Sequence, residues 1–172
     1  MDLPKRKANR LPDFNYSQYG SYFLTLCTKN KLPLLCKIQK GTIFEPPAVL
    51  LSQYGEIVQQ KILSISKFYP DMEVDKYVVM PNHIHIILSI FSDEARSQTP
   101  ANSKIPALIS SFKRFTNKES GTDLWQRSYY DHVIRNQTDY DAIWKYIDEN
   151  PYKWTEDRFY IPEYNPNSPN NR

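Results

Sequence analysis

Short apolar runs separated by turn residues predict four β-strands in this chain. The runs are rich in β-branched and aromatic residues, which suit the pleated and half-buried surface of a strand. They span residues 21–28, 72–80, 83–90 and 129–134. The first run is apolar enough to be a central strand. Pro81 and Asn82 separate the second and third runs by a tight turn, which predicts an antiparallel hairpin.

Three further stretches carry apolar residues at helical spacing. They span residues 53–67, 103–118 and 139–149. Ser52 is predicted to cap the first of these helices. Thr138 is predicted to cap the third, with Asp141 completing a start that resembles a capping box. Residues 29–47, where proline and glycine interrupt the pattern, are expected to form a long loop or a lid.

The order of these elements is strand, helix, strand, strand, helix, strand, helix. The first six match the ferredoxin-like βαββαβ plan, an α+β architecture in which two helices cover one face of a four-stranded antiparallel sheet. The last helix is then an addition at the C-terminal end. We expect one domain over residues 21–154, an irregular N-terminal segment over 1–20 and a tail over 155–172.

Composition indicates a folded globular protein with a mildly basic surface. The chain has 172 residues, 40% hydrophobic and 14% aromatic, including thirteen tyrosines and three tryptophans. Such rings pack in a core or stack on nucleic-acid bases. The net charge of +3 permits a nucleic-acid partner without demonstrating one.

Several other classes of protein are disfavoured. Cys27 and Cys36 form neither a metal-ligand spacing nor a disulfide framework, so we expect reduced thiols and a cytoplasmic location. Residues 1–7 lack the apolar core of a signal peptide. No apolar run approaches the length of a membrane span, so no membrane partner is expected. Without a glycine-rich phosphate loop, a nucleotide cofactor is not expected.

The third predicted strand begins with two histidines that share one face. Alternation along a strand puts His83 and His85 together and Ile84 on the opposite face. Two imidazoles on a rigid backbone are a good start for a divalent metal site. The alternative is a pair of histidines on the open face of a half-exposed strand. Two of the three histidines in the chain stand here, which favours a functional role.

The predicted helix 139–149 presents a phenol and an amide together. Tyr146 and Asn150 lie one turn apart beside the apolar stripe of this helix. A metal held by imidazoles and an amide oxygen polarises a phosphate, and a tyrosine beside it attacks phosphorus to form a phosphotyrosine. The alternative is that Tyr146 is one packing residue among thirteen tyrosines.

Five motifs in this order resemble a known family. They are RLPDF at 10–14, YFLT at 22–25, YVVMPNHIH at 77–85, WQRSYYDHVIR at 125–135 and YIDENP at 146–151. The chain resembles the HUH single-strand endonucleases with one catalytic tyrosine. Among these it is most similar to the REP-associated tyrosine transposases and related insertion-sequence transposases. The resemblance covers about residues 10–154.

The resemblance implies a role for each candidate residue. His83 and His85 match the metal-binding histidine pair, and Tyr146 matches the nucleophile on the helix after the fourth strand. Asn150 stands where related insertion-sequence enzymes place a glutamine that completes the metal site. His132 is an alternative third ligand, because the fourth strand borders the same sheet face. The implied cofactor is Mg²⁺ or Mn²⁺.

The resemblance also implies DNA transposition and recombination chemistry. The expected substrate is single-stranded DNA with hairpin structure, cleaved through a 5′-phosphotyrosine intermediate. Lys113, Arg114 and Arg135 are candidates for DNA-backbone contacts from their charge and placement. Some relatives form dimers that exchange the tyrosine helix and others act as monomers, so a homodimer stays open. A mobile element and a host-domesticated role are equally compatible with these residues.

Two other functions fit parts of the sequence. In a non-catalytic module that binds single-stranded nucleic acid, Tyr22, Tyr129 or Tyr130 would be stacking platforms on a ferredoxin-like sheet. A metal hydrolase unrelated to DNA would need further ligands, for which Asp75 and Asp131 are available.

Overall fold

The computed structural model describes residues 19–91 and 104–162. Four strands form one antiparallel sheet in the order β4-β5-β1-β6. These strands are β1 Gly20–Cys27, β4 Met72–Met80, β5 His83–Ile90 and β6 Tyr130–Ile134. All four predicted strands are present. The first is an inner strand of the sheet, as its apolar sequence predicts.

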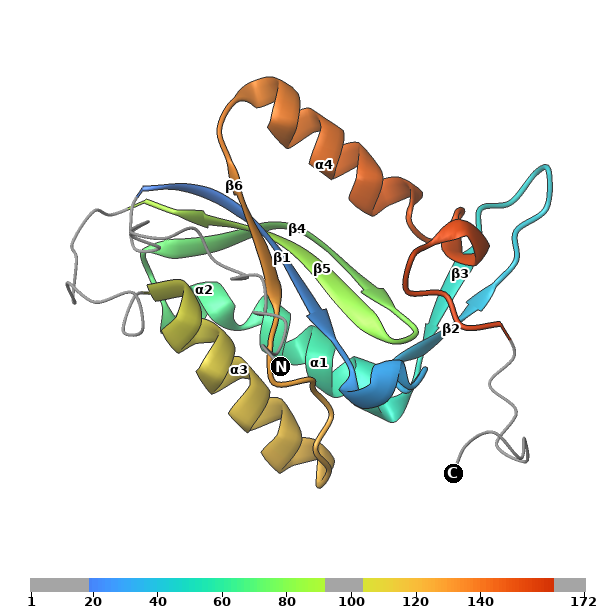
Figure 1. Ribbon diagram of the computed structural model, residues 1–172, viewed down its shortest axis with the longest axis horizontal. Coiled ribbons are helices and arrows are strands. Elements are labelled where there is room, and N and C mark those ends of the chain that lie inside the picture. Colours follow the sequence, from blue (N-terminus) through green and yellow to red (C-terminus); the bar gives the residue numbers. More distant parts are fainter. Residues whose placement is uncertain (1–18, 92–103, 163–172) are drawn as a thin grey trace, which may run out of the picture.

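Helices lie on both faces of this sheet (Figure 1). They are α1 Gln53–Leu63, α2 Ile65–Phe68, α3 Lys104–Ser120 and α4 Gln137–Glu149. The first three cover one face, and α4 crosses the other. Ile84, Ile86 and Leu88 of β5 alternate into the core with residues of α1 and α3 such as Ile62 and Ile105. The mixed architecture with an antiparallel sheet agrees with the predicted class at this level.

Residues 29–47 do not form the predicted long loop. A 3-10 turn at Lys29–Lys31 leads into a second, two-stranded antiparallel sheet. Its strands are β2 Cys36–Gln39 and β3 Ala48–Leu51, and the hairpin stands beside the main sheet (Figure 1). Strands of four residues are too short for an alternating pattern to identify them.

The predicted helix 53–67 is broken at Ser64, which separates α1 from α2. Ser52 caps α1 as predicted, since its hydroxyl accepts a hydrogen bond from the backbone N–H of Gly55 at 3.2 Å. The second predicted helix is present as α3 and extends to Ser120, while residue 103 lies outside the described ranges.

The prediction for the start of α4 is wrong. The side chain of Asn136, and not of Thr138, caps this helix by accepting a hydrogen bond from the backbone N–H of Asp139 at 2.9 Å. Both are cap-forming residue types, and a shift of two residues changes little of the apolar pattern. The helix ends at Glu149, just before Pro151, as predicted.

Residues 1–18 and 163–172 lie outside the described residues. They include the motif at 10–14, nearly all of the predicted N-terminal segment and most of the predicted tail. Cys27 and Cys36 are both buried and unpaired, in agreement with the expected thiols. Within residues 19–91 and 104–162, every helix is too short or too polar to cross a membrane.

Candidate metal and tyrosine site

Strand β5 places His83 and His85 on the sheet face that α4 crosses. Their partners on β1 are Cys27 and Thr25. Both imidazoles are fully buried, and their ring centroids lie 4.5 Å apart. The ring of Phe23 stacks on His85 at 5.0 Å. The pair therefore lies in an enclosed site, in contrast to the alternative of a half-exposed sheet face.

A hydrogen bond at the Nδ1 atom fixes the orientation of each imidazole. His83 Nδ1 lies 2.9 Å from Asn82 Oδ1, and His85 Nδ1 lies 2.8 Å from Thr25 Oγ1. The Asn82 amide nitrogen is occupied, because it donates to the carbonyl of Phe159 at 2.7 Å. His83 therefore donates from Nδ1 and keeps the lone pair of Nε2. This arrangement orients imidazole ligands in metal sites.

Burial keeps both imidazoles uncharged. It lowers the pKa of His83 from 6.5 to about 4, against the opposing charge of Asp157. The pKa of His85 lies well below its ordinary value, first because of burial and then because of the neighbouring His83. A neutral imidazole is the form that binds a metal ion, so both side chains are ready to act as ligands near neutral pH.

Helix α4 brings Tyr146 and Asn150 to the same site. The hydroxyl of Tyr146 lies 3.3 Å from His85 Nε2, and its ring meets that of Phe23 edge-on at 6.1 Å. Tyr146 is 40% exposed, whereas Asn150 is buried. One turn of helix therefore places an accessible phenol and an enclosed amide beside the histidine pair.

Sequence reasoning missed Asp157, which completes the cluster. Ligand atoms of His83, His85 and Asp157 all lie within 4.8 Å of one another. The carboxylate accepts a hydrogen bond from Asn150 Nδ2 at 3.3 Å and from the Tyr146 hydroxyl at 3.4 Å. Asp157 follows a short 3-10 turn, Trp154–Glu156, in a stretch with no periodic pattern that would have singled it out.

The donor atoms in this cluster fit a divalent cation. His83 Nε2 and Asn150 Oδ1 are buried and have no hydrogen-bond partner within the described ranges. The Asn150 side chain lies close enough to His83 to act on its pKa, yet makes no hydrogen bond of ordinary geometry with it. Buried unpaired polar atoms are rare in proteins. Two of them beside a carboxylate and a second imidazole are a donor set that divalent metals bind.

The surroundings of Tyr146 set the acidity of the phenol. Burial raises its pKa above 10, and the charge of Asp157 acts in the same direction, while Asn150 and Arg158 oppose them. The guanidinium of Arg158 stacks on the ring of Phe159 at 4.5 Å and lines the same cavity as Tyr146, of about 290 Å³. Formation of a phenolate therefore needs additional positive charge.

His132 lies apart from the cluster. Its Nε2 atom hydrogen-bonds the carboxylate of Asp139 at 2.8 Å, in the first turn of α4. Asp75 accepts hydrogen bonds from Ser89 and Tyr140 instead. Of the described carboxylates and histidines, the structure groups neither these nor Asp131 with the histidine pair.

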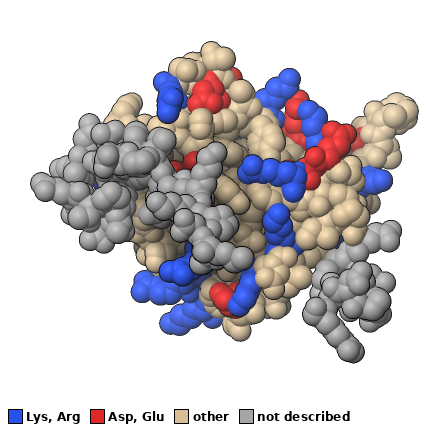
Figure 2. Space-filling view, in the orientation of Figure 1, with Lys and Arg blue, Asp and Glu red and all other residues tan. Residues whose placement is uncertain are grey.

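The three basic residues predicted to contact DNA differ in whether the protein already engages their charged groups. Lys113 donates to the backbone carbonyls of residues 126–128 at 2.7 to 3.3 Å, and burial lowers its pKa to about 8. Arg114 and Arg135 are exposed, and Arg114 lies over the ring of Phe115 at 4.9 Å. Basic side chains gather over α3 (Figure 2). Lys113 holds the loop before β6, so its charge is already engaged.

A family model described as IS200-like transposase matches residues 48–150, which include the histidine pair, Tyr146 and Asn150. The chain belongs to the IS200-like transposase family. This membership confirms the resemblance drawn from the motifs. The matched range ends before Asp157, so the carboxylate of the cluster comes from outside it.

Individual relatives agree with this membership. The chain is 33% identical to an uncharacterised protein of Haemophilus influenzae over 91% of this chain and 93% of that protein. It is 27% identical to the REP-associated tyrosine transposase of Escherichia coli, over 80% and 70% of the two chains. A solved REP-associated tyrosine transposase bound to a REP hairpin has a similar fold, with a TM-score of 0.57, 21% identity and coverage of 80% and 71%. The family membership and the relative from Escherichia coli support a transposase-like enzyme.

Proposed function

We propose that this protein is a metal-dependent endonuclease and strand transferase for single-stranded DNA, acting through a 5′-phosphotyrosine intermediate. The observation that carries the proposal is the 3.3 Å distance between the Tyr146 hydroxyl and His85 Nε2. This short distance brings an accessible nucleophile and a buried set of metal ligands together in one site. Membership of the IS200-like transposase family supports the same chemistry.

Four side chains would hold Mg²⁺ or Mn²⁺ in this site. They are His83 and His85 through Nε2, Asp157 through its carboxylate and Asn150 through Oδ1. When bound, the cation supplies positive charge that polarises a phosphate oxygen and favours the phenolate of Tyr146. The family and the cluster both support a divalent metal.

Cleavage then follows from the position of Tyr146. Its oxygen forms a bond to phosphorus while the bond from phosphorus to the 3′-oxygen breaks, so the 5′ end stays on the tyrosine. The proton of the phenol passes to solvent, which reaches the partly exposed side chain. The departing 3′-oxygen takes up a proton and becomes a hydroxyl. Attack by a second 3′-hydroxyl reverses the step and joins two strands.

The proposed substrate is single-stranded DNA that carries a hairpin. The solved REP-associated tyrosine transposase is bound to a REP hairpin, and its fold resembles this chain. Arg114 and Arg135 are exposed and suited to backbone contacts, whereas the hydrogen bonds of Lys113 favour a structural role. Action on DNA, together with the unpaired thiols of Cys27 and Cys36, favours the cytoplasm as its location.

One chain is proposed to build the whole site. Helix α4 reaches across the sheet of its own chain, so Tyr146 meets His85 without a partner subunit. The strand order supports a ferredoxin-like plan to which α4 adds the tyrosine. We expect no activity when inactive His85→Ala and Tyr146→Phe variants are mixed. Restored cleavage in this mixture would instead indicate a dimer that exchanges α4.

Covalent trapping tests the proposed reaction. The protein is incubated with Mn²⁺ and hairpin-forming single-stranded oligonucleotides from the DNA that flanks its gene, then separated on a denaturing gel. We expect a protein–DNA band that disappears with EDTA and in Tyr146→Phe. A band that survives Tyr146→Phe would assign the nucleophile to another tyrosine. Binding of the hairpins without any band would favour the non-catalytic binding module.

A further inference from the structure

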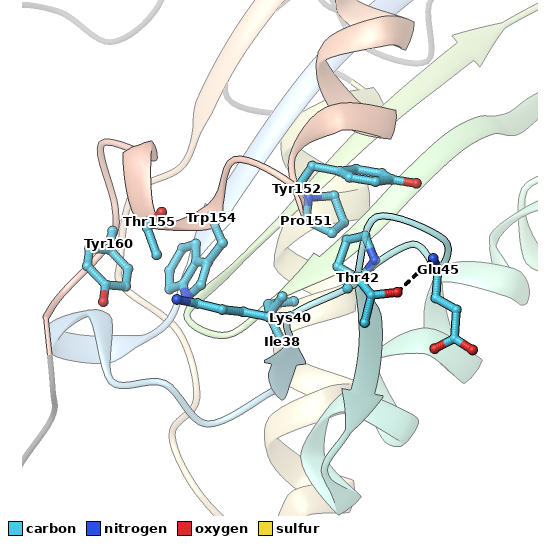
Figure 3. Close-up of a pocket in the computed structure, with 11 residues that line it drawn as sticks. Ile38, Lys40, Thr42, Glu45, Pro151, Tyr152, Trp154, Thr155 and Tyr160 are labelled. Atoms are coloured by element: carbon cyan, nitrogen blue, oxygen red, sulfur yellow. Dashed lines mark hydrogen bonds between the residues drawn. The ribbon is translucent and has the colours of Figure 1, made fainter.

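A second cavity, of about 480 Å³, lies between the β2–β3 hairpin and the segment after α4 (Figure 3). Two segments far apart in the sequence form its walls. The hairpin contributes Lys40 and Thr42, and the later segment contributes Tyr152, Trp154 and Tyr160. The volume lies within the range of about 300–1,000 Å³ that is usual for small-ligand sites.

The cavity adjoins the metal and tyrosine site. Trp154 lines the cavity, and its ring centroid lies 6.0 Å from that of His83. The segment that carries Trp154 continues directly to Asp157 of the ligand cluster. A strand whose phosphate lies at the cluster therefore has this cavity as its immediate neighbour.

The hairpin wall has a defined shape. At Gly41 a Cβ atom would lie 2.3 Å from the carbonyl oxygen of Glu45, so only glycine fits this close approach. The backbone N–H of Thr42 donates to that oxygen at 2.9 Å, and the Thr42 hydroxyl accepts from the N–H groups of Phe44 and Glu45. These contacts preform one side of the cavity, which reduces the ordering needed when a ligand binds.

The lining combines flat rings with a cation. Trp154 and Tyr160 meet edge-on with 5.3 Å between ring centroids, and Tyr152 is 64% exposed. The side chain of Lys40 extends toward Trp154 (Figure 3). Aromatic rings stack on bases and an ammonium neutralises phosphate, which is the combination that holds single-stranded nucleic acid.

We propose that this cavity binds one unpaired nucleotide of the DNA strand next to the cleaved phosphate. Its base stacks on the aromatic side chains, with Tyr152 as the accessible platform, and Lys40 contacts its phosphate. The proposal rests on the proposed function, because it assigns the ligand to the same DNA strand. It adds a place where the enzyme holds the single strand that flanks the hairpin.

A scan with abasic nucleotides tests the cavity through binding alone. The Tyr146→Phe variant, which lacks the proposed nucleophile, is titrated with hairpin oligonucleotides from the DNA flanking the gene. Each oligonucleotide lacks one base at a different unpaired position, and fluorescence anisotropy gives its Kd. We expect one position at which the missing base weakens binding by about 5- to 140-fold, the range for one stacked base.

Variants of the cavity locate that effect. Adding Tyr152→Ala should weaken binding of the intact oligonucleotide and abolish the penalty at that one position. Tyr152→Phe keeps the ring and should retain the penalty. Phe68→Ala removes an exposed ring from α2, which lies on the opposite face of the sheet, and should change nothing. Lys40→Gln should reduce the slope of log Kd against log salt by about 0.7.

The outcomes separate this proposal from the proposed function. A penalty that persists in Tyr152→Ala, or the lack of any sensitive position, overturns the cavity assignment even if the wild-type protein forms a covalent adduct. A Tyr152-dependent position without any adduct from the wild-type protein would support the cavity and overturn the proposed cleavage.

Discussion

Replacement of Thr25 by valine should weaken metal binding without touching a metal ligand. The Thr25 hydroxyl lies 2.8 Å from His85 Nδ1, and both side chains are fully buried. Valine keeps the shape of threonine and removes the hydroxyl, so the Nδ1–H group that His85 carries when its Nε2 atom binds a metal has no acceptor. An unsatisfied buried donor costs about 1–3 kcal/mol.

Without a metal, the imidazole of Thr25→Val avoids that penalty by carrying its proton on Nε2. There it finds the hydroxyl of Tyr146 at 3.3 Å as an acceptor, but the lone pair needed by a metal is lost. Binding a metal then requires the proton to return to Nδ1. At about 1.4 kcal/mol for each tenfold change, the penalty predicts an affinity about 5- to 140-fold lower. Losses of about 10- to 100-fold are usual when the partner of a ligand histidine is removed.

Calorimetric titration of the full chain with Mn²⁺ near neutral pH measures this effect. Thr25→Ser is the matched control, because it keeps the hydroxyl and should bind close to the wild-type affinity. Circular dichroism checks that Thr25→Val is folded. If the folded variant binds Mn²⁺ as tightly as the wild type, the Thr25 hydroxyl does not support His85 as a metal ligand.

Three further changes have expected outcomes. Asp157→Asn removes the carboxylate of the cluster and should lower Mn²⁺ affinity at least about tenfold by calorimetry; unchanged affinity would remove Asp157 from the ligand set. Below pH 6.5 the unfolded metal-free chain protonates His83, while the folded chain does so only near pH 4. Across that window the free energy of unfolding in urea melts should therefore fall by about 3 kcal/mol more in the wild type than in His83→Gln, which keeps the similar contribution of His85; an equal fall in the two proteins would contradict the burial of a neutral His83. Lys113→Gln should lower the urea midpoint while the salt dependence of DNA binding stays as in the wild type, because its ammonium already bonds three carbonyls; a reduced salt slope would restore it as a DNA contact.

The sequence predicts the histidine pair well, because its geometry is local. Alternation along one strand is enough to put His83 and His85 on a common face, and the structure places the strand at the predicted residues. The helical spacing of Tyr146 and Asn150 is equally local. The family membership confirms the resemblance, whereas the roles of these residues stay predictions.

The rest of the site depends on contacts between distant segments. Asp157 approaches the cluster because the segment after α4 folds back, where the amide of Asn82 donates to the carbonyl of Phe159. That hydrogen bond joins residues 77 positions apart, which no periodic pattern encodes. Strands β2 and β3 were not predicted, for a different reason. They are only four residues long, and proline and glycine surround them.

Mass spectrometry can identify the tyrosine that carries the DNA. The adduct formed with Mn²⁺ and a flanking hairpin oligonucleotide is digested with protease and nuclease, and mass spectrometry locates the remaining nucleotide. We expect a phosphodiester on Tyr146, in a reaction that Asp157→Asn slows. A nucleotide on Tyr129, Tyr130 or any other tyrosine would contradict the proposed role of Tyr146.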